Sequence, residues 1–369
     1  MTAPSGRPPF RADHIGSLLR PQMLRQAFRD HAAGKLSDAD FAQVQDDAIR
    51  DVIAMQEDVG LDVVTDGEFR RASYWGRFVE RVGGFAIKPA EFTFRDDAGH
   101  ELAFTGTYAA AKLRRAQPLA LDEFTFARGL TGKTVKITLP APSTMHFYRC
   151  GDFADPAVYP DPDAFFADLT QVFRDEIADL AAAGCRYVQL DEVAIAMLCD
   201  PAIRATVAAA GHAPDALIGR YIDAVNASVA AAPAGMAVGV HVCRGNFKGH
   251  YLSAGGYDAV AERFFAATAV NHFLLEFDTP RAGDFSPLRF VPASKGVVLG
   301  LVSSKTPQLE STSALCRRIE EAARYVDLDR LAVSPQCGFA STVAGNPVTA
   351  ADEEAKLRLV VDVARQVWG

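Results

Sequence analysis

Four residues in the second half of the chain are of the types that bind a metal ion through nitrogen, sulfur and oxygen. They are His241, Cys243, Glu276 and Cys337, and each closes or follows a short apolar run. Such runs are typical of buried strands. Because His241 and Cys243 are two residues apart, their side chains leave the same face of a strand and can reach one ion. Two thiolates, one imidazole and one carboxylate form a tetrahedral set that suits zinc.

The alternative for each of these residues is a purely structural role. A single Cys at a strand end is often a small buried hydrophobic residue, and a single His is often a hydrogen-bonded residue of the core. The metal interpretation therefore depends on all four residues occurring at the same end of successive strands. It is a weaker signal than a doubled Cys-x-x-Cys motif, because the ligands are far apart in the sequence.

The order of apolar and amphipathic segments predicts the fold that positions these residues. Short apolar runs alternate with longer amphipathic ones, which is typical of βα units in a parallel sheet. Eight candidate strands end at 14–17, 63–66, 136–139, 187–190, 239–242, 273–276, 298–301 and 331–334. Helical patterns lie between them, for example at 38–59, 162–183, 214–231 and 308–325. We therefore expect an α/β fold, a single (β/α)8 TIM barrel over residues 1–369.

Polar residues follow these strands at their carboxyl ends, where TIM-barrel enzymes place their active sites. Ser17 follows the first candidate strand, Glu68 the second, and Asp191 the fourth. We expect these side chains to share one site with the four candidate metal ligands.

Two segments depart from the simple alternation. Residues 85–130 contain two alternating runs around the turn 96–100, which predicts a β-hairpin inserted after the second strand. Residues 146–162 carry Tyr148, Phe153 and Tyr159 among Pro and Asp. This composition predicts a long mobile loop, and loops of that length are commonly functional.

Composition excludes several other classes of protein. The net charge of −8 and the scattered Lys and Arg residues argue against a nucleic-acid-binding face. No apolar stretch approaches the roughly 20 residues that span a bilayer, and the N-terminus has no hydrophobic signal region. The six cysteines of so large a chain without an export signal are expected to be reduced. We therefore expect a cytoplasmic protein that contacts neither membrane nor nucleic acid. The sequence does not decide whether the protein forms a homo-oligomer.

Four motifs together resemble a known family. They are Asp13–Pro21, Thr65–Arg71, Gln189–Glu192 and His241–Asn246. They are similar to the catalytic C-terminal half of cobalamin-independent methionine synthase, and most closely to its short single-domain relatives. The resemblance extends from Asp13 to Gly338, which is nearly the whole chain.

The resemblance implies a zinc-dependent S-methyltransferase that converts homocysteine to methionine. His241, Cys243, Glu276 and Cys337 match the zinc ligands of the family, and Ser17 matches the serine that holds the homocysteine carboxylate. Glu68 and Asp191 match the two acids that hold its ammonium group, and are the candidate catalytic residues. Tyr148 lies near the position of an aromatic residue that stacks on folate. Zinc would convert the substrate thiol, whose pKa is ordinarily near 8.5, to a nucleophilic thiolate.

The chain also departs from the family pattern on the side of the methyl donor. The full-length synthase has a second barrel that helps to bind polyglutamyl folate, and this chain has no room for it. Val302 stands where the synthase has a His implicated in methyl transfer. The identity of the methyl donor is therefore undecided at this stage: it is a simple folate, a methylcorrinoid protein or a small methyl compound.

Two other functions stay open at this stage. The first is alkyl transfer to another thiol, as in the epoxyalkane:coenzyme M transferases that resemble the same family. A sulfonate would need cationic partners, and the motifs offer Arg20, Arg70, Arg71 and Arg244. The second is a non-catalytic zinc-binding barrel or a metal-dependent hydrolase, although two thiolates count against a hydrolase. Glu68 and Asp191 favour an amino-acid thiol, because an ammonium group needs anionic partners.

Overall fold

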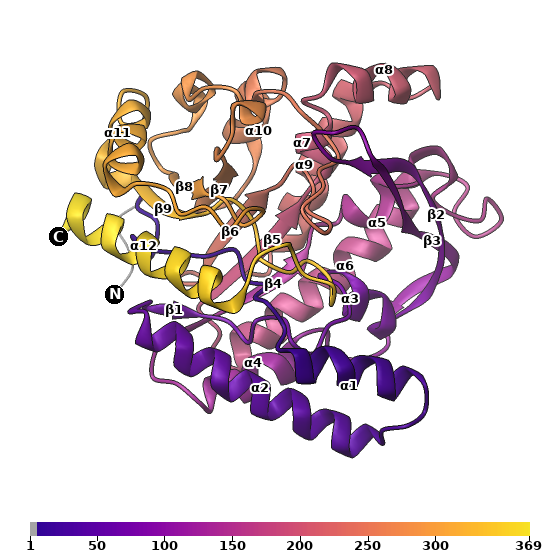
Figure 1. The fold of residues 1–369 in the computed structure, drawn as a ribbon. Coiled ribbons are helices and arrows are strands. Elements are labelled where there is room, and N and C mark those ends of the chain that lie inside the picture. The colour runs from indigo at the N-terminus through magenta and orange to yellow at the C-terminus, as the bar shows by residue number, and fades with distance from the viewer. Residues whose placement is uncertain (1–5) are drawn as a thin grey trace.

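A curled parallel sheet with helices packed around it forms the body of the protein (Figure 1). The computed structural model describes residues 6–369. Seven strands form the sheet in the order β1-β4-β5-β6-β7-β8-β9. Their bounds are β1 Val63–Val64, β4 Thr134–Pro140, β5 Tyr187–Glu192, β6 Ala237–Val242, β7 His272–Glu276, β8 Gly296–Val302 and β9 Leu331–Pro335. The predicted α/β barrel-type fold is confirmed.

The helices expected between the strands are present. Those predicted over four ranges are α2 Asp38–Asp58, α6 Pro162–Ala182, α9 Pro214–Val229 and α11 Thr312–Ala322. The others are α1 Gln22–Ala32, α3 Gly76–Arg81, α4 Leu121–Arg128, α5 Thr144–Phe147, α7 Ala194–Met197, α8 Pro201–Ala209, α10 Ala261–Ala267 and α12 Ala350–Trp368. The local sequence determines where such a helix begins. In α6, the Asp161 side chain accepts the backbone N–H groups of Asp163 and Ala164, and Pro162 follows as the first helical residue.

The first predicted strand, at residues 14–17, was wrong. In its place, Ala12 makes one parallel bridge to Val333 of β9, and the Leu18 N–H donates to the Gly67 carbonyl over 3.1 Å. Between these contacts Gly16 has φ of +132°, which breaks an extended strand. Its carbonyl accepts a hydrogen bond from the Thr65 hydroxyl at 2.6 Å. The segment 11–18 therefore lies between β9 and β1 as an irregular connection rather than an eighth strand.

The predicted hairpin is present after β1. Its strands, β2 Val82–Arg95 and β3 Glu101–Arg115, pair antiparallel around a turn at 96–100. The hairpin starts three residues before the predicted range of 85–130 and ends at Arg115, and α4 follows it within that range. Near the turn, the backbones of Arg95 and Tyr251 exchange two hydrogen bonds of 2.8 Å. These bonds attach the hairpin to the loop that follows β6.

The segment 146–162, predicted as a long mobile loop, is packed against the hairpin. It contains the end of α5 and the short 3-10 helix η1 Cys150–Asp152. Tyr148, Phe153 and Tyr159 are buried. The Tyr159 hydroxyl accepts the backbone N–H of Leu113 in β3 at 2.7 Å. Among the described helices, none combines the length and the apolar composition that a membrane crossing requires.

Candidate active site

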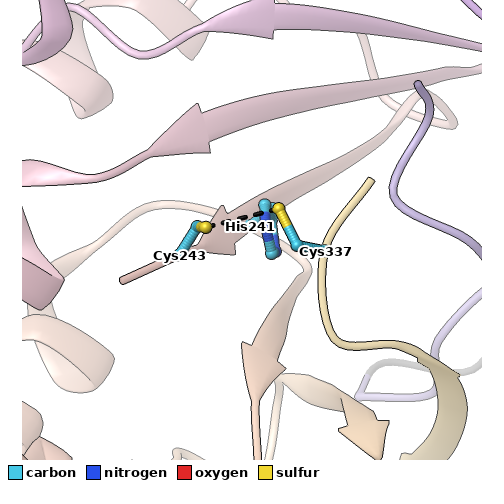
Figure 2. A group of neighbouring side chains, drawn as sticks. All are labelled: His241, Cys243 and Cys337. Carbon is cyan, nitrogen blue, oxygen red and sulfur yellow. Dashed lines mark hydrogen bonds between the residues drawn. The ribbon is translucent and has the colours of Figure 1, made fainter. Parts of the chain in front are cut away.

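Three of the four predicted metal ligands meet at the carboxyl end of the sheet (Figure 2). His241 and Cys243 lie at the end of β6, and Cys337 follows β9. Their ligand atoms all lie within 4.8 Å of one another, and the two sulfur atoms are 3.3 Å apart. All three side chains are buried. The pleat of β6 thus brings one nitrogen and one sulfur to a common point, as the spacing of two residues predicted.

The hydrogen bonds of these side chains fit a metal ligand set. The Nδ1 atom of His241 lies 3.1 Å from the Leu274 carbonyl. Because a carbonyl only accepts, Nδ1 carries the proton and Nε2 keeps its lone pair. Nε2 is buried and has no hydrogen-bond partner within residues 6–369. The Gly245 N–H donates to the Cys243 sulfur over 3.2 Å. A buried unpaired nitrogen beside two sulfur atoms is a donor set for a cation such as zinc.

Glu276, the fourth predicted ligand, lies outside this group of three. It ends β7 and is fully buried. Its Oε2 accepts the Arg244 backbone N–H at 2.9 Å, while its Oε1 is 3.9 Å from Lys305 Nζ. Oε1 has no hydrogen-bond partner in the described part of the chain. One carboxylate oxygen is therefore free of hydrogen bonds, and the other is anchored to the residue that follows Cys243.

The predicted substrate-binding residues line one cavity with the metal-ligand candidates. The cavity has a volume of about 50 Å³. Its walls include Ser17, Glu68, Tyr148, Asp191, His241, Cys243 and Cys337. The structure therefore brings together residues from five predicted strand ends and from the segment after β4. Glu276 is not among the residues that line this cavity.

Glu68 and Asp191 each have one oxygen bound by the protein. The Thr138 hydroxyl donates to Glu68 Oε1 at 2.7 Å, and the Gln189 amide donates to Asp191 Oδ1 at 2.7 Å. Glu68 Oε2 is buried and without a hydrogen-bond partner among the described residues. Burial raises the pKa of the Asp191 carboxyl to about 7. Each carboxylate can therefore accept from a cationic group in the cavity.

The backbone at Glu68 is in a conformation that is rare for residues other than glycine. Its φ is +61°, and its N–H donates to Asp66 Oδ1 at 2.9 Å. Such a left-handed residue is uncommon and is concentrated at functional sites. The turn directs the side chain of Glu68 towards Thr138 and the cavity.

An aromatic wall closes the cavity on the side of the hairpin, and the sequence alone did not indicate most of it. The hydroxyl groups of Tyr74 and Tyr148 are 3.1 Å apart. Phe94 of β2 also lines the cavity and packs edge-on against Phe104 with a centroid distance of 4.9 Å. Asn246 and Ser341 were likewise missed. Tyr74 and Phe94 belong to no metal or acid motif, and only the folding of the hairpin over the sheet brings Phe94 here.

The arginines considered for a sulfonate group have other partners. Arg71 pairs with Glu123 over 2.6 Å, Arg20 donates to backbone carbonyls, Arg70 pairs with Asp46, and Arg244 donates to the Gly255 carbonyl. Among the described residues that line the cavity there is no arginine. Val302, at the end of β8, is fully buried and also lies outside the lining.

Comparison with known proteins assigns the chain to a family. The family model described as "Cobalamin-independent synthase, Catalytic domain" matches residues 10–366. The chain belongs to this family. The chain is therefore a transferase, and membership supports transfer of a methyl group to a thiol. The predicted family and enzyme class are confirmed.

Relatives of this chain match it over most of their length. The uncharacterized protein YxjH of Bacillus subtilis is 39% identical over 366 residues, which is 98% of this chain and 95% of YxjH. A methionine synthase of Pyrococcus horikoshii is 28% identical over 88% of this chain and 85% of its own. The crystal structure of a Listeria monocytogenes protein assigned as a vitamin-B12-independent methionine synthase is 27% identical. It covers 98% of both chains with a TM-score of 0.74.

Proposed function

We propose that this protein methylates homocysteine to methionine at a zinc site formed by His241, Cys243 and Cys337, with Glu276 as the fourth ligand. The observation that carries the proposal is the composition of one buried cavity. It joins the three clustered metal-ligand candidates with two carboxylates, Glu68 and Asp191. A thiol with an ammonium group complements both parts of this cavity.

The residues of the chain bind and orient the substrate in this proposal. The free oxygens of Glu68 and Asp191 accept from the ammonium group, and Ser17 binds the carboxylate. Bound zinc supplies the acidity that converts the substrate thiol to a thiolate at neutral pH. Fixing the amino-acid part at three points holds the sulfur in one orientation relative to the methyl donor, which lowers the entropic cost of the displacement.

For the methyl donor, we propose a compound or group held against Tyr74, Phe94 and Tyr148. These three residues form the wall of the cavity that carries no charge. No lysine or arginine is among the described residues that line the cavity, so a polyglutamate tail would find no cationic partner there. We therefore do not expect polyglutamyl folate to be preferred over a simple folate, a methylcorrinoid protein or a small methyl compound. Turnover with each donor in the presence of homocysteine distinguishes them. A strong preference for the polyglutamate form would contradict this part of the proposal.

The test of the thiol substrate is a comparison of homocysteine with its des-amino analogue, 4-mercaptobutanoate, by calorimetry on the zinc-loaded protein. Loss of the ammonium group removes the partner of the remaining oxygen of each carboxylate, so the analogue should bind at least about tenfold more weakly. Glu68→Gln and Asp191→Asn should narrow that difference. Glu80→Gln, an exposed acid on α3, should leave it unchanged. Tighter binding of coenzyme M than of homocysteine would instead favour alkyl transfer to a non-amino thiol.

A further inference from the structure

A chain of buried polar side chains runs through the interior of the sheet and ends at the cavity. Tyr187, Gln189 and Asp191 alternate along β5, so their side chains leave the same face of the strand. Below the cavity, the Tyr187 hydroxyl lies 2.7 Å from both Asp13 Oδ2 and His272 Nε2. Lys136 of β4 connects Asp13 to Gln189. Its Nζ lies 2.8 Å from Asp13 Oδ1.

The contacts of Lys136 determine which way the Gln189 amide faces. Its ammonium group has three N–H donors. They go to Asp13 Oδ1, to the His14 carbonyl and, over 2.9 Å, to Gln189 Oε1. Because Lys136 has no acceptor, the amide of Gln189 must turn its oxygen towards Lys136 and its NH2 group away from it.

The NH2 group of Gln189 consequently points to two acceptors. It donates to the Ile15 carbonyl at 2.6 Å and to Asp191 Oδ1 at 2.7 Å. Gln189 and Lys136 are almost fully buried, so water does not compete for these bonds. Asp191 is thus bound through one oxygen and faces the cavity, as Glu68 does through Thr138 on the neighbouring strand.

We propose that Gln189, oriented by Lys136, is a positioning residue for the amino-acid substrate. It fixes the rotation of the Asp191 carboxylate so that the second oxygen is presented to the substrate ammonium group. Gln189 does not line the cavity itself and acts only through Asp191. This inference rests on the proposed function and adds the residues that create the selectivity for an amino-acid thiol.

The experiment measures the affinities of zinc-loaded Gln189→Met and Gln189→Asn for homocysteine and for 4-mercaptobutanoate. Met keeps the volume but removes the amide, and Asn keeps an amide that is too short to join Lys136 to Asp191. Both variants should bind homocysteine about tenfold more weakly, which corresponds to one charge-assisted hydrogen bond. Their affinity for the des-amino analogue should be unchanged. Tyr187→Phe is the matched control, because it alters the same buried network on the side away from Asp191 and should keep the wild-type ratio.

The outcomes separate this inference from the proposed function. If the wild-type protein does not discriminate between the two thiols, the proposed function itself fails. If it discriminates and the folded Gln189 variants keep the wild-type ratio, the positioning role is overturned. An equal loss in Tyr187→Phe would also overturn it, because the effect would then be a general one of the buried network. If circular dichroism shows that Gln189→Met does not fold, the affinities of the milder variant Gln189→Asn decide whether Gln189 has the positioning role.

Discussion

At the scale of single residues, the two clustered cysteines give the most direct test of the metal site. We expect about one zinc per chain in the purified protein. Cys243→Ser and Cys337→Ser should each lose most of it, because a serine hydroxyl is a much poorer ligand than a thiolate. Cys316→Ser, in a half-buried position on α11, is the control and should keep the zinc. Metal analysis that finds full occupancy in both ligand variants would refute the site.

The raised pKa of Asp191 predicts a pH dependence for substrate selection. Burial raises this pKa to about 7, so the carboxyl is mostly neutral at pH 6 and mostly ionised at pH 8. Only the ionised form pairs strongly with an ammonium group. The preference for homocysteine over 4-mercaptobutanoate should therefore fall several-fold between pH 8 and pH 6. Using the ratio of the two affinities cancels the titration of the thiol that both share.

Asp191→Asn is the control for this pH dependence. It should show a small preference at both pH values, with no change between them in this range. A wild-type preference that is constant from pH 6 to pH 8 would contradict the assignment of Asp191 to the ammonium group.

The sequence predicted the site residues to the extent that they follow strands. His241 and Cys243 lie two residues apart, and the period of two along a strand is enough to place them on the same face. Ser17, Glu68 and Asp191 follow segments whose ends meet at one edge of the sheet. The position of Glu276 could not be predicted in the same way. Its rotamer depends on the Arg244 backbone and on Lys305, which comes from another loop. Gln189 carried no signal beyond its motif, because its role depends on a lysine in β4.

At the scale of secondary-structure elements, the sequence predicted the helices well and the first strand badly. The segment 14–17 ends in a polar residue as the other predicted strands do, but Gly16 and the side-chain partners of the backbone, such as Thr65, prevent a ladder. The hairpin was visible from its alternation and turn. Its contact with the loop after β6 was not, since that pairing joins segments about 150 residues apart.

The attachment of α12 predicts an effect of pH on stability. Glu353 in its first turn is almost fully buried, and its Oε2 accepts the Leu19 N–H at 2.8 Å. Burial raises the pKa of this carboxyl to about 8, above the value near 4.3 of an unfolded chain. The native state therefore binds the proton more tightly, and Glu353 lowers the free energy of unfolding progressively as the pH rises from about 4 to about 8.

Glu353→Gln removes this titration while its amide oxygen can still accept from Leu19. The variant should be close to wild type at pH 5 and more stable by roughly 3–5 kcal/mol at pH 9. Denaturant unfolding at the two pH values measures this difference. Glu354→Gln, which alters the neighbouring, partly exposed acid that pairs with Arg358, should show little change. A Glu353→Gln variant that is less stable than wild type at pH 9 would show that the ionised form is the favoured one.

At the scale of the whole molecule, one sheet supports two polar regions, which Gln189 connects. The cavity lies at the carboxyl ends of the strands, and the network of Asp13, Lys136 and Tyr187 lies inside the sheet below it. Between strands β7, β8 and β9, the small apolar cluster of Leu274, Val298 and Ala332 fills the interior together with Ile15. The irregular segment 11–18 contributes to all three regions, through Asp13, Ile15 and Ser17.

The buried ion pair between Asp13 and Lys136 also limits how the sequence can change over evolution. Both side chains are buried, and 123 positions separate them in the chain. Replacing one alone leaves an unpaired buried charge, which costs about 3–5 kcal/mol, whereas replacing both with apolar residues of similar size is often nearly neutral. In a double-mutant cycle, Asp13→Leu and Lys136→Met should therefore cost less together than the sum of their separate effects. Additive effects would contradict this coupling. A relative that has lost one member of the pair is expected to carry a compensating change at the other, so positions 13 and 136 should covary among related sequences.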